Sequence, residues 1–186
     1  GTYDDLPADL AREMRRAERY QKTMLELSGR PDQQLSFTHI TWDNIPEQAS
    51  NLRQQLGLSE SFAPKYSQPQ QVFTFWRNLL ESWGFLVFQT TKISLSTFRG
   101  LSIYHKELPI ILVNGADSPY GKVFTLFHEL AHVANRTSGL CALQENSHEE
   151  IIANRFAANF LMPEASVQKL TEYIDAANPY EQAEQL

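Results

Sequence analysis

Residues 124–133 read FTLFHELAHV, which is the most specific pattern in the chain. The pattern places His128, Glu129 and His132 in the order HExxH. On a helix, positions four apart lie one turn apart on the same face, so both imidazoles can reach one metal ion. Glu129 stands about 100° round the helix from His128, where its carboxylate can act as a general base on a water near that ion.

An alternative interpretation is a helix that shows two polar histidines to solvent. The apolar positions of the same helix argue against it, because they make the helix a core element: Val123, Phe127, Leu130 and Ala134. Pro119 suits a first helical position, so the sequence predicts a helix over residues 119–136. We therefore expect its histidines to face the interior or a cleft.

A catalytic zinc site usually has three protein ligands, so two histidines leave one ligand to be found. The downstream candidates lie together near the start of the next predicted helix: Glu145, His148, Glu149 and Glu150. Glu150 shares a helix face with Asn154, so both side chains can face a cleft. However, Ser147 and Glu150 also have the S-x-x-E spacing of a capping box, which would only close the helix start. Spacing alone leaves these candidates open.

Helical spacing of apolar residues predicts three helices earlier in the chain, at about residues 10–27, 45–57 and 72–83. Short runs rich in Ile, Val, Phe and Tyr predict three strands, at 85–89, about 100–105 and 110–114. The last two strands are expected to form a hairpin through residues 106–109. After the HExxH helix, another helix starts near Ser147, Met162-Pro163 breaks it, and a last helix runs to about Ala177.

This order of elements predicts one α+β domain, with a small twisted sheet of about three strands packed with helices. We expect residues 1–44 to form an N-terminal helix and a connecting segment. Residues 45–178 are expected to form the main domain, and residues 179–186 an acidic C-terminal tail.

The charge balance limits the classes of partner. The chain has 186 residues with 16 Lys plus Arg and 22 Asp plus Glu, and 16 minus 22 gives a formal charge of −6. Direct nucleic-acid binding over the whole domain is not expected, because neutralising phosphates needs clustered cations. The first helix has a basic face between Arg12 and Lys22. We interpret it as a solvated face, and a contact with nucleic acid or an acidic partner is the alternative.

The sequence also bears on the compartment. No stretch approaches the roughly 18 to 20 apolar residues that a membrane span needs, so no membrane contact is expected. The single cysteine, Cys141, cannot form an internal disulfide, which agrees with a reducing compartment. We therefore expect a cytoplasmic protein.

Two stretches of the chain resemble the ImmA/IrrE zinc metallopeptidases of bacteria and mobile elements. One is residues 98–133, FRGLSIYHKELPIILVNGADSPYGKVFTLFHELAHV, and the other is residues 150–163, EIIANRFAANFLMP. The family pattern for the second is E-x-x-A-N-x-F-A-x-x-L-L-x-P, where Phe160 replaces the more frequent Leu. Ala131 replaces a Gly that is frequent in the HExxH stretch. The resemblance covers roughly residues 45–167.

The resemblance implies a zincin-like fold, with a zinc metallopeptidase domain at residues 45–178. It implies His128, His132 and Glu150 as Zn²⁺ ligands and Glu129 as the catalytic base. It also implies a regulatory protease that cleaves a specific repressor, often a helix-turn-helix protein, and so switches on stress or mobile-element genes. Some relatives carry a helix-turn-helix DNA-binding domain ahead of the peptidase, so such a domain upstream of these residues is compatible with the resemblance.

Several supporting roles stay open at the level of sequence. The developing oxyanion needs a second donor besides the metal, and five residues are chemically able: Tyr104, His105, Tyr120, His148 and Arg155. The outer ring nitrogens of the histidines need partners, and the candidates are Asp117, Thr125 and Asn154. A peptide substrate is expected to add as a strand along residues 101–104.

A rival function from another class is a non-catalytic regulatory module. In that case the metal site is structural or vestigial, and the domain holds a transcription factor. Glu129 favours the enzyme, because a structural metal site has no need of a base at that position.

Overall fold

The computed structural model describes residues 6–137, 148–164 and 166–168. The elements in chain order are α1 (Ala8–Ser28), the 3-10 helix η1 (Trp42–Asn44), α2 (Ile45–Gln55), α3 (Pro69–Ser82), β1 (Leu86–Thr90), β2 (Gly100–Ile103), β3 (Ile110–Asn114), α4 (Pro119–Ala134) and α5 (His148–Leu161). This confirms the predicted α+β class and the three strands. Among the described residues, no helix combines the length and the apolar character that a membrane span requires.

Several predictions fall on residues that the structure does not describe. These are the acidic tail at 179–186, most of the last predicted helix, and three single residues: Cys141, Glu145 and Ser147.

The sheet is mixed, with the strand order β1-β3-β2. β1 pairs with β3 in parallel, with Leu86 opposite Ile110. β2 pairs with β3 in antiparallel fashion, with Gly100 opposite Val113. β3 is buried along its whole length because it is the central strand. β2 is therefore an edge strand of the described sheet.

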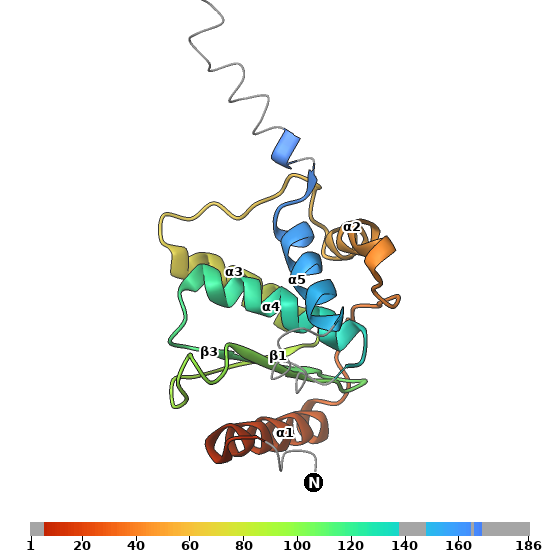
Figure 1. The fold of residues 1–186 in the computed structure, drawn as a ribbon. Coiled ribbons are helices and arrows are strands. Elements are labelled where there is room, and N and C mark those ends of the chain that lie inside the picture. Colours follow the sequence, from red (N-terminus) through yellow and green to blue (C-terminus); the bar gives the residue numbers. More distant parts are fainter. Residues whose placement is uncertain (1–5, 138–147, 165, 169–186) are drawn as a thin grey trace, which may run out of the picture.

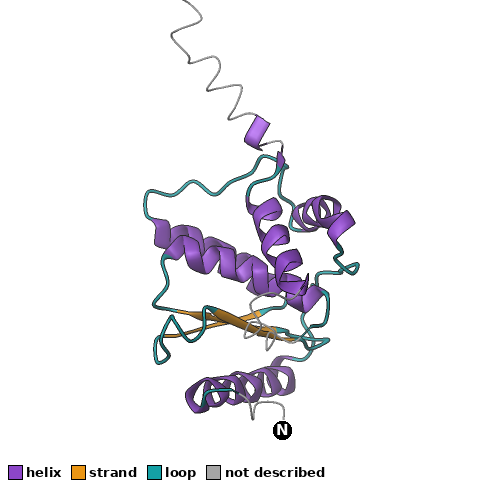
Figure 2. Ribbon diagram, viewed as in Figure 1, coloured by secondary structure: helices purple, strands orange, loops and turns teal. Residues whose placement is uncertain are grey.

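Helices cover both faces of the sheet (Figures 1 and 2). On one face, α3 and α4 lie side by side and α5 crosses α4, over a core that includes Trp76, Phe127 and Phe160. On the other face, α1 packs through Leu10 and Met14 in a second core. Apolar positions at helical spacing on α1 predict this buried stripe, and burying it gives α1 most of its stability.

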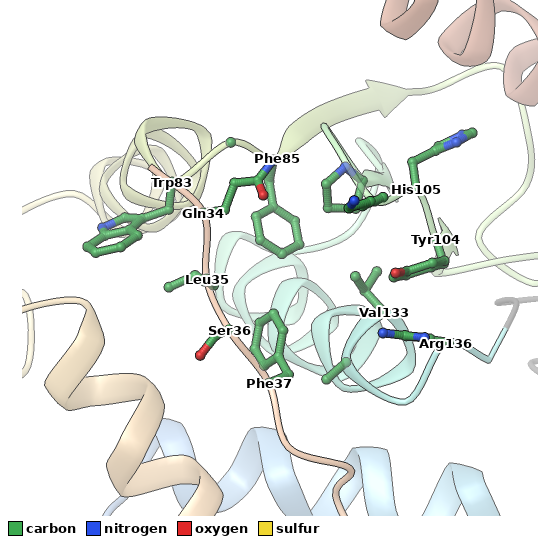
Figure 3. A pocket seen from close by; sticks show the side chains of 14 residues that line it. Gln34, Leu35, Ser36, Phe37, Trp83, Phe85, Tyr104, His105, Val133 and Arg136 are labelled. Atoms are coloured by element: carbon green, nitrogen blue, oxygen red, sulfur yellow. The ribbon is translucent and has the colours of Figure 1, made fainter. Parts of the chain in front are cut away.

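The segment between α1 and η1 is held by side-chain amides. The backbone N–H and C=O of Ser36 pair with the Gln55 amide, at 2.9 Å each. Those of Ile40 pair with the Asn135 amide, at 2.7 and 2.9 Å. Asn135 caps the end of α4, so this pairing fixes the end of the HExxH helix. A cavity of about 280 Å³ lies beside the segment, lined by residues such as Phe37 (Figure 3).

Arg53 on α2 is a buried cation that is 2% exposed, and its guanidinium connects two other parts of the chain. Its guanidinium donates hydrogen bonds to the carbonyl oxygens of Ser59 and Phe62 in the loop after α2. It also donates to the carbonyl oxygen of Phe160 at 2.7 Å, near the end of α5. One cation therefore joins the loop to α5.

Most element boundaries lie within two residues of the sequence predictions, and three differences have a clear description. α3 begins at Pro69 rather than near residue 72, because proline occupies the first turn, where its missing N–H costs nothing. β2 ends at Ile103 rather than at residue 105. η1 was not predicted; the Asn44 side chain accepts from Thr41 N at 2.8 Å and stabilises this single turn.

Candidate metal centre

α4 begins at a well-formed cap. The Ser118 hydroxyl accepts a hydrogen bond from Gly121 N at 3.0 Å, and Pro119 occupies the first turn. These features fix where α4 begins, and its buried apolar stripe fixes the rotation of the helix. The face that carries His128 and His132 is thereby turned toward the start of α5.

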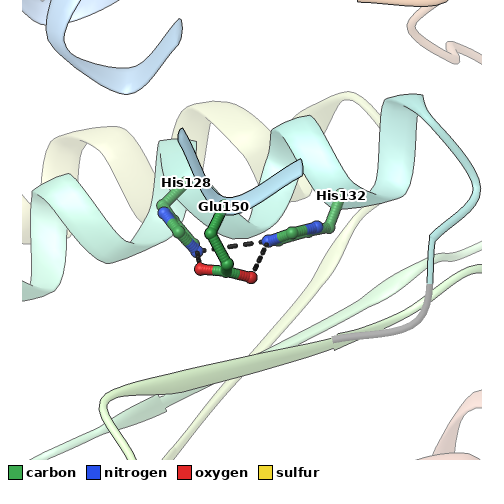
Figure 4. A group of neighbouring side chains, drawn as sticks. All are labelled: His128, His132 and Glu150. Carbon is green, nitrogen blue, oxygen red and sulfur yellow. Dashed lines mark hydrogen bonds and ion pairs between the residues drawn. The ribbon is translucent and has the colours of Figure 1, made fainter. Parts of the chain in front are cut away.

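The two imidazoles and the Glu150 carboxylate converge on one point (Figure 4). Nε2 of His128 lies 3.2 Å from Nε2 of His132. Glu150 Oε2 lies 3.2 Å from Nε2 of His128, and Glu150 Oε1 lies 3.0 Å from Nε2 of His132. The three ligand atoms lie within 4.8 Å of one another. Two nitrogens and one carboxylate form the His₂Glu donor set known from catalytic zinc sites.

The outer ring nitrogens of both histidines have partners. His128 Nδ1 lies 2.9 Å from Asn154 Oδ1, and His132 Nδ1 lies 2.9 Å from Thr137 Oγ1. An amide oxygen accepts only, so His128 carries its proton on Nδ1 when neutral. Its Nε2 lone pair is then available to a metal ion. A cation between the two Nε2 atoms and the carboxylate therefore fits the residues present.

Electrostatics within the cluster favour a charged carboxylate. The hydrogen bond with His128 is the largest effect on Glu150 and holds the pKa of its carboxyl below the ordinary value. Burial lowers the pKa of His128, but the hydrogen bond to Glu150 and the charges of Glu129 and Glu150 outweigh burial and raise it overall. Burial and the charge of His128 lower the pKa of His132. These opposite directions favour a proton on His128 over one on His132.

Glu129 lies on the side of α4 that faces the sheet, and its side chain is 2% exposed. The Ser102 hydroxyl on β2 donates a hydrogen bond to Glu129 Oε2 at 2.8 Å. Burial raises the pKa of the Glu129 carboxyl to about 7, although the charge of His128 and the Ser102 hydrogen bond pull it down. A carboxyl with a pKa near neutrality is suited to both accepting and returning a proton.

Gly100 lets β2 approach α4 closely. A Cβ at this position would stand 2.2 Å from Thr125 Cγ2 and 3.1 Å from Glu129 Cγ. The distance to Thr125 leaves no room for a side chain and the distance to Glu129 is tight, so the strand and the helix meet here because residue 100 is glycine. This contact brings Ser102 within reach of Glu129.

The candidates for the third ligand differ in how close they lie to the two imidazoles and in how exposed they are. Glu150 is the carboxylate that lies beside both imidazoles, whereas His148 and Glu149 are exposed in the same turn. Glu145 and the capping residue Ser147 are outside the described residues.

The structure brings one of the three candidate partners to a ring nitrogen, namely Asn154. Asp117 instead contacts Arg99 at 3.0 Å and caps the turn before α4, and Thr125 lies against Gly100.

Two of the candidate oxyanion donors take part in cation–π contacts. The Arg155 guanidinium stacks on the Trp42 ring at 4.0 Å. His105 Nε2 is buried without a hydrogen-bond partner among the described residues, and the Glu18 carboxylate lies 4.0 Å away. The Tyr104 ring lies under the Arg136 guanidinium at 5.3 Å, beside the cavity of Figure 3. Tyr120 is 61% exposed on the first turn of α4, and His148 is exposed on α5.

Two residues that contact the site were not among the candidates: Ser102 and Thr137. Thr137 lies five positions after His132, beyond the end of α4, where helical spacing no longer applies. Ser102 lies 27 positions before Glu129 on another element. The signal available for Ser102 was strand alternation, which turns Gly100 and Ser102 to the same face of β2.

Comparison with protein families finds a match in the second half of the chain. The model of the IrrE N-terminal-like domain, Peptidase_M78, matches residues 86–176. The match includes all three strands, α4 and α5, whereas α1, α2 and α3 precede it. No curated protein and no solved structure matches the chain. The ImmA/IrrE resemblance is thus confirmed as a match of residues 86–176 to the IrrE N-terminal-like domain.

Proposed function

We propose that the protein is a zinc-dependent endopeptidase. The observation that carries this proposal is the convergence of His128, His132 and Glu150 on one point, with the buried Glu129 carboxylate next to His128 in the helix. The match to the Peptidase_M78 family model supports a peptidase. The presence of Glu129 favours catalysis over a structural site.

His128 and His132 are the ligands we assign through Nε2, and Glu150 is the third ligand through its carboxylate. Asn154 and Thr137 orient the two imidazoles from their outer nitrogens. Zinc bound there supplies Lewis acidity, which polarises a peptide carbonyl and makes water acidic enough to lose a proton near neutral pH.

Glu129 is the residue we assign to proton transfer. Hydrolysis adds one water across the C–N bond, so that OH joins the carbonyl carbon and H joins the leaving nitrogen. The Glu129 carboxylate accepts the proton of the attacking water and then donates it to the leaving amine, which returns the carboxylate to its starting state. Ser102 holds the carboxylate in one orientation during both transfers.

The outer side of β2 is the place we propose for the substrate backbone. Asn114 N donates to Arg99 O at 2.8 Å, and hydrogen-bonded pairs alternate along an antiparallel ladder. Leu101 therefore bonds to β3, whereas the backbone groups of Gly100 and Ser102 point away from β3. An extended peptide would pair with these groups as an added strand. Both residues are buried, so this pairing requires that their outer backbone groups become accessible.

We propose that the natural substrate is a specific repressor-type protein, in particular one with a helix-turn-helix domain. Its cleavage would switch on stress or mobile-element genes in the cytoplasm. The support is the resemblance to the ImmA/IrrE family and, for the compartment, the single cysteine Cys141. A DNA-binding domain upstream of these residues belongs to the same proposal.

Metal analysis of the purified protein tests the first part. We expect one zinc per chain in the wild type and in Glu129→Gln, and loss of zinc in His128→Ala and in His132→Ala. Cleavage of peptides should require both zinc and Glu129. Retained turnover in Glu129→Gln would contradict the mechanism. Full zinc loading with no cleavage of any substrate would favour the rival regulatory module that holds a transcription factor.

Two substitutions at one position test the substrate strand. Ser102→Pro removes an outward N–H together with the partner of Glu129, whereas Ser102→Ala removes only that partner. If the substrate pairs with β2, the proline variant loses far more cleavage than the alanine variant while both keep zinc. Equal cleavage by the two variants would argue against strand addition.

Labelling of new N-termini in a cell extract tests the substrate class. Wild-type protein should create new termini in a helix-turn-helix protein, and Glu129→Gln should not. New termini confined to unrelated proteins would contradict the repressor assignment.

A further inference from the structure

A cavity of about 280 Å³ lies at the C-terminal end of α4, beside the segment that joins α1 to η1 (Figure 3). The apolar part of its wall includes Leu35, Phe37, Phe85 and Val133. Its volume is just below the roughly 300–1,000 Å³ of typical ligand pockets, so the cavity suits a small ligand. A single ring or a short branched chain fits this size better than a nucleotide does.

The wall of this cavity is held in place by contacts within the protein. The side-chain amides of Gln55 and Asn135 fix residues 36–40 at both ends through hydrogen bonds to the backbone. Phe85 and Val133 are each 3% exposed, because they belong to the main core. A ligand would therefore enter a preformed site and would not have to order its wall.

The ionisable side chains of the described lining are all basic: His105, Lys106 and Arg136. They lie together although the whole chain has a formal charge of −6. The His105 Nε2 atom lies 4.0 Å from the Glu18 carboxylate on α1. Lys106 and Arg136, in contrast, form no ion pair with any residue that the structure describes. Two cations without a carboxylate partner make an anion the complementary ligand.

Arg136 has an unusual backbone conformation for its residue type. It follows the C-cap Asn135 and has a φ of 55°, in the left-handed region. Its N–H bonds to Val133 O at 3.1 Å, and Thr137 N–H bonds to His132 O at 2.9 Å, which together form a Schellman motif. Glycine is the usual residue at this position, because any other side chain costs free energy there. Closing the helix end therefore does not explain an arginine here.

The polar groups of the cavity converge at one side of it. The Arg136 guanidinium lies 5.3 Å from the centre of the Tyr104 ring, and Figure 3 shows this guanidinium and the Tyr104 hydroxyl beside Val133. A guanidinium can donate two parallel hydrogen bonds to a carboxylate, and a phenol hydroxyl can donate another. Lys106 adds a second positive charge. Apolar walls with donors at one side suit a carboxylate on an apolar body.

We infer that this cavity binds a small carboxylic acid in its ionised form, with an aromatic or branched aliphatic body against Phe37 and Phe85 and the carboxylate at Arg136. The inference goes beyond peptide hydrolysis and does not depend on it, because none of the proposed zinc ligands lines the cavity. Arg136 immediately precedes Thr137, whose Oγ1 lies 2.9 Å from Nδ1 of His132. A bound carboxylate thus lies one residue from a contact that orients a proposed zinc ligand.

Titration of the protein with phenylacetate, followed in NMR spectra of the protein, tests the inference. Phenylacetamide is the uncharged probe, because an amide of the same shape replaces its carboxylate. Phenylacetate should bind roughly tenfold or more tightly than phenylacetamide, as expected for hydrogen bonds to a charged group. The largest shifts should fall in residues 34–37 and 133–137. Inorganic phosphate is the third probe and should bind more weakly than phenylacetate, since it has no apolar body.

Arg136→Gly is the decisive variant, because it removes the guanidinium and places the preferred residue in the left-handed position. It should unfold at the same urea concentration as the wild type or at a higher one, and its affinity for phenylacetate should fall by roughly tenfold or more. Lys106→Ala should weaken binding by a smaller factor, because solvent screens an exposed ammonium. Arg15→Ala is the control, at an exposed arginine of α1 outside the lining, and should bind like the wild type.

Five results would overturn the inference. Equal binding of phenylacetate and phenylacetamide would show that the cavity does not select a carboxylate, and tighter binding of phosphate would make it a phosphate site. Unchanged binding in Arg136→Gly would place the ligand elsewhere, such as at the metal centre. A less stable Arg136→Gly would show that the arginine serves the fold. Absence of binding by phenylacetate, benzoate and 3-methylbutanoate would exclude the whole class of ligand.

Discussion

The hydroxyl of Ser102 donates a hydrogen bond of 2.8 Å to Oε2 of Glu129, across the contact between β2 and α4. Both side chains are 2% exposed, so water does not readily replace either partner. The edge strand proposed to receive the substrate therefore also positions the proposed catalytic base.

Ser102→Ala should lower kcat by about 10-fold to 100-fold and leave zinc content unchanged, because a buried hydrogen bond to a charged group is worth roughly 1–3 kcal/mol. Steady-state kinetics with metal analysis measure both. Ser96→Ala is the control, since this serine is exposed in the loop before β2 and bonds only to Ser94 among the contacts described. A Ser102→Ala enzyme with wild-type kcat would show that the hydrogen bond has no catalytic role.

Loss of Asn154 or Thr137 should weaken zinc binding. Each orients one imidazole through Nδ1, and removing such partners costs roughly 10–100-fold in metal affinity. Competition with a chelator measures the affinity of Asn154→Ala and Thr137→Ala. Asn159→Ala is the matched control on α5, because that amide donates to the Arg155 carbonyl instead. Equal affinity in Asn154→Ala and Asn159→Ala would remove the orienting role.

Glu150→Ala should weaken zinc binding by more than those variants, because it removes a proposed ligand rather than the partner of a ligand. Glu149→Ala, at the exposed neighbouring position, should bind zinc like the wild type. Titration with zinc and thermal unfolding of both variants provide the measurements. A less stable Glu150→Ala with unchanged zinc affinity would mean that Glu150 only caps α5.

Gly100→Ala should destabilise the protein by about 1–3 kcal/mol, because the added Cβ overlaps Thr125 Cγ2. Urea unfolding measures the loss. Thr125→Ser removes that methyl group. Gly100→Ala should therefore lower the free energy of unfolding much less in a Thr125→Ser background than in the wild type. If the losses of unfolding free energy in the two single variants simply add in the double variant, the two residues do not meet as described.

In the metal-free protein, ionisation of Glu129 should lower the free energy of unfolding as the pH rises from 4.5 to 7. Burial raises the pKa of this carboxyl from 4.5 to about 7, so the folded protein binds more protons than the unfolded chain in that range. The stabilisation from the protonated Glu129 carboxyl is fully present below pH 4.5 and is lost as the pH rises through 7. It amounts to roughly 3 kcal/mol.

Urea unfolding of the chelator-treated wild type and of Glu129→Gln, at pH 5 and pH 8, checks this dependence. The glutamine variant should lose less stability over the interval, because its side chain does not ionise. Identical pH dependence in the two proteins would contradict the burial of a titrating carboxyl at this position.

The HExxH helix α4 is the part of the site that sequence predicts best, because the spacing of residues within one helix is enough to predict it. Spacing of four positions sets His128 above His132, and the same spacing links Glu150 to Asn154. The choice of Glu150 over its neighbours came from the family pattern, since first-turn residues of α5 are equivalent in spacing. The structure places the Glu150 carboxylate beside both imidazoles.

Contacts between distant elements could not be predicted in the same way. Ser102 meets Glu129 because Gly100 brings β2 against α4, and no local pattern contains that approach. The buried stripe of α1 was predicted from its periodicity, but periodicity does not say which surface covers it. Here the surface is the far face of the sheet, through residues such as Leu101 and Leu112.

The buried hydrogen bonds of Arg53 have a consequence for the loop between α2 and α3. Because one guanidinium ties Ser59 and Phe62 to the end of α5, the base of the loop is anchored independently of its tip. Residues 63–67 can then differ in sequence without moving the helix that carries Glu150.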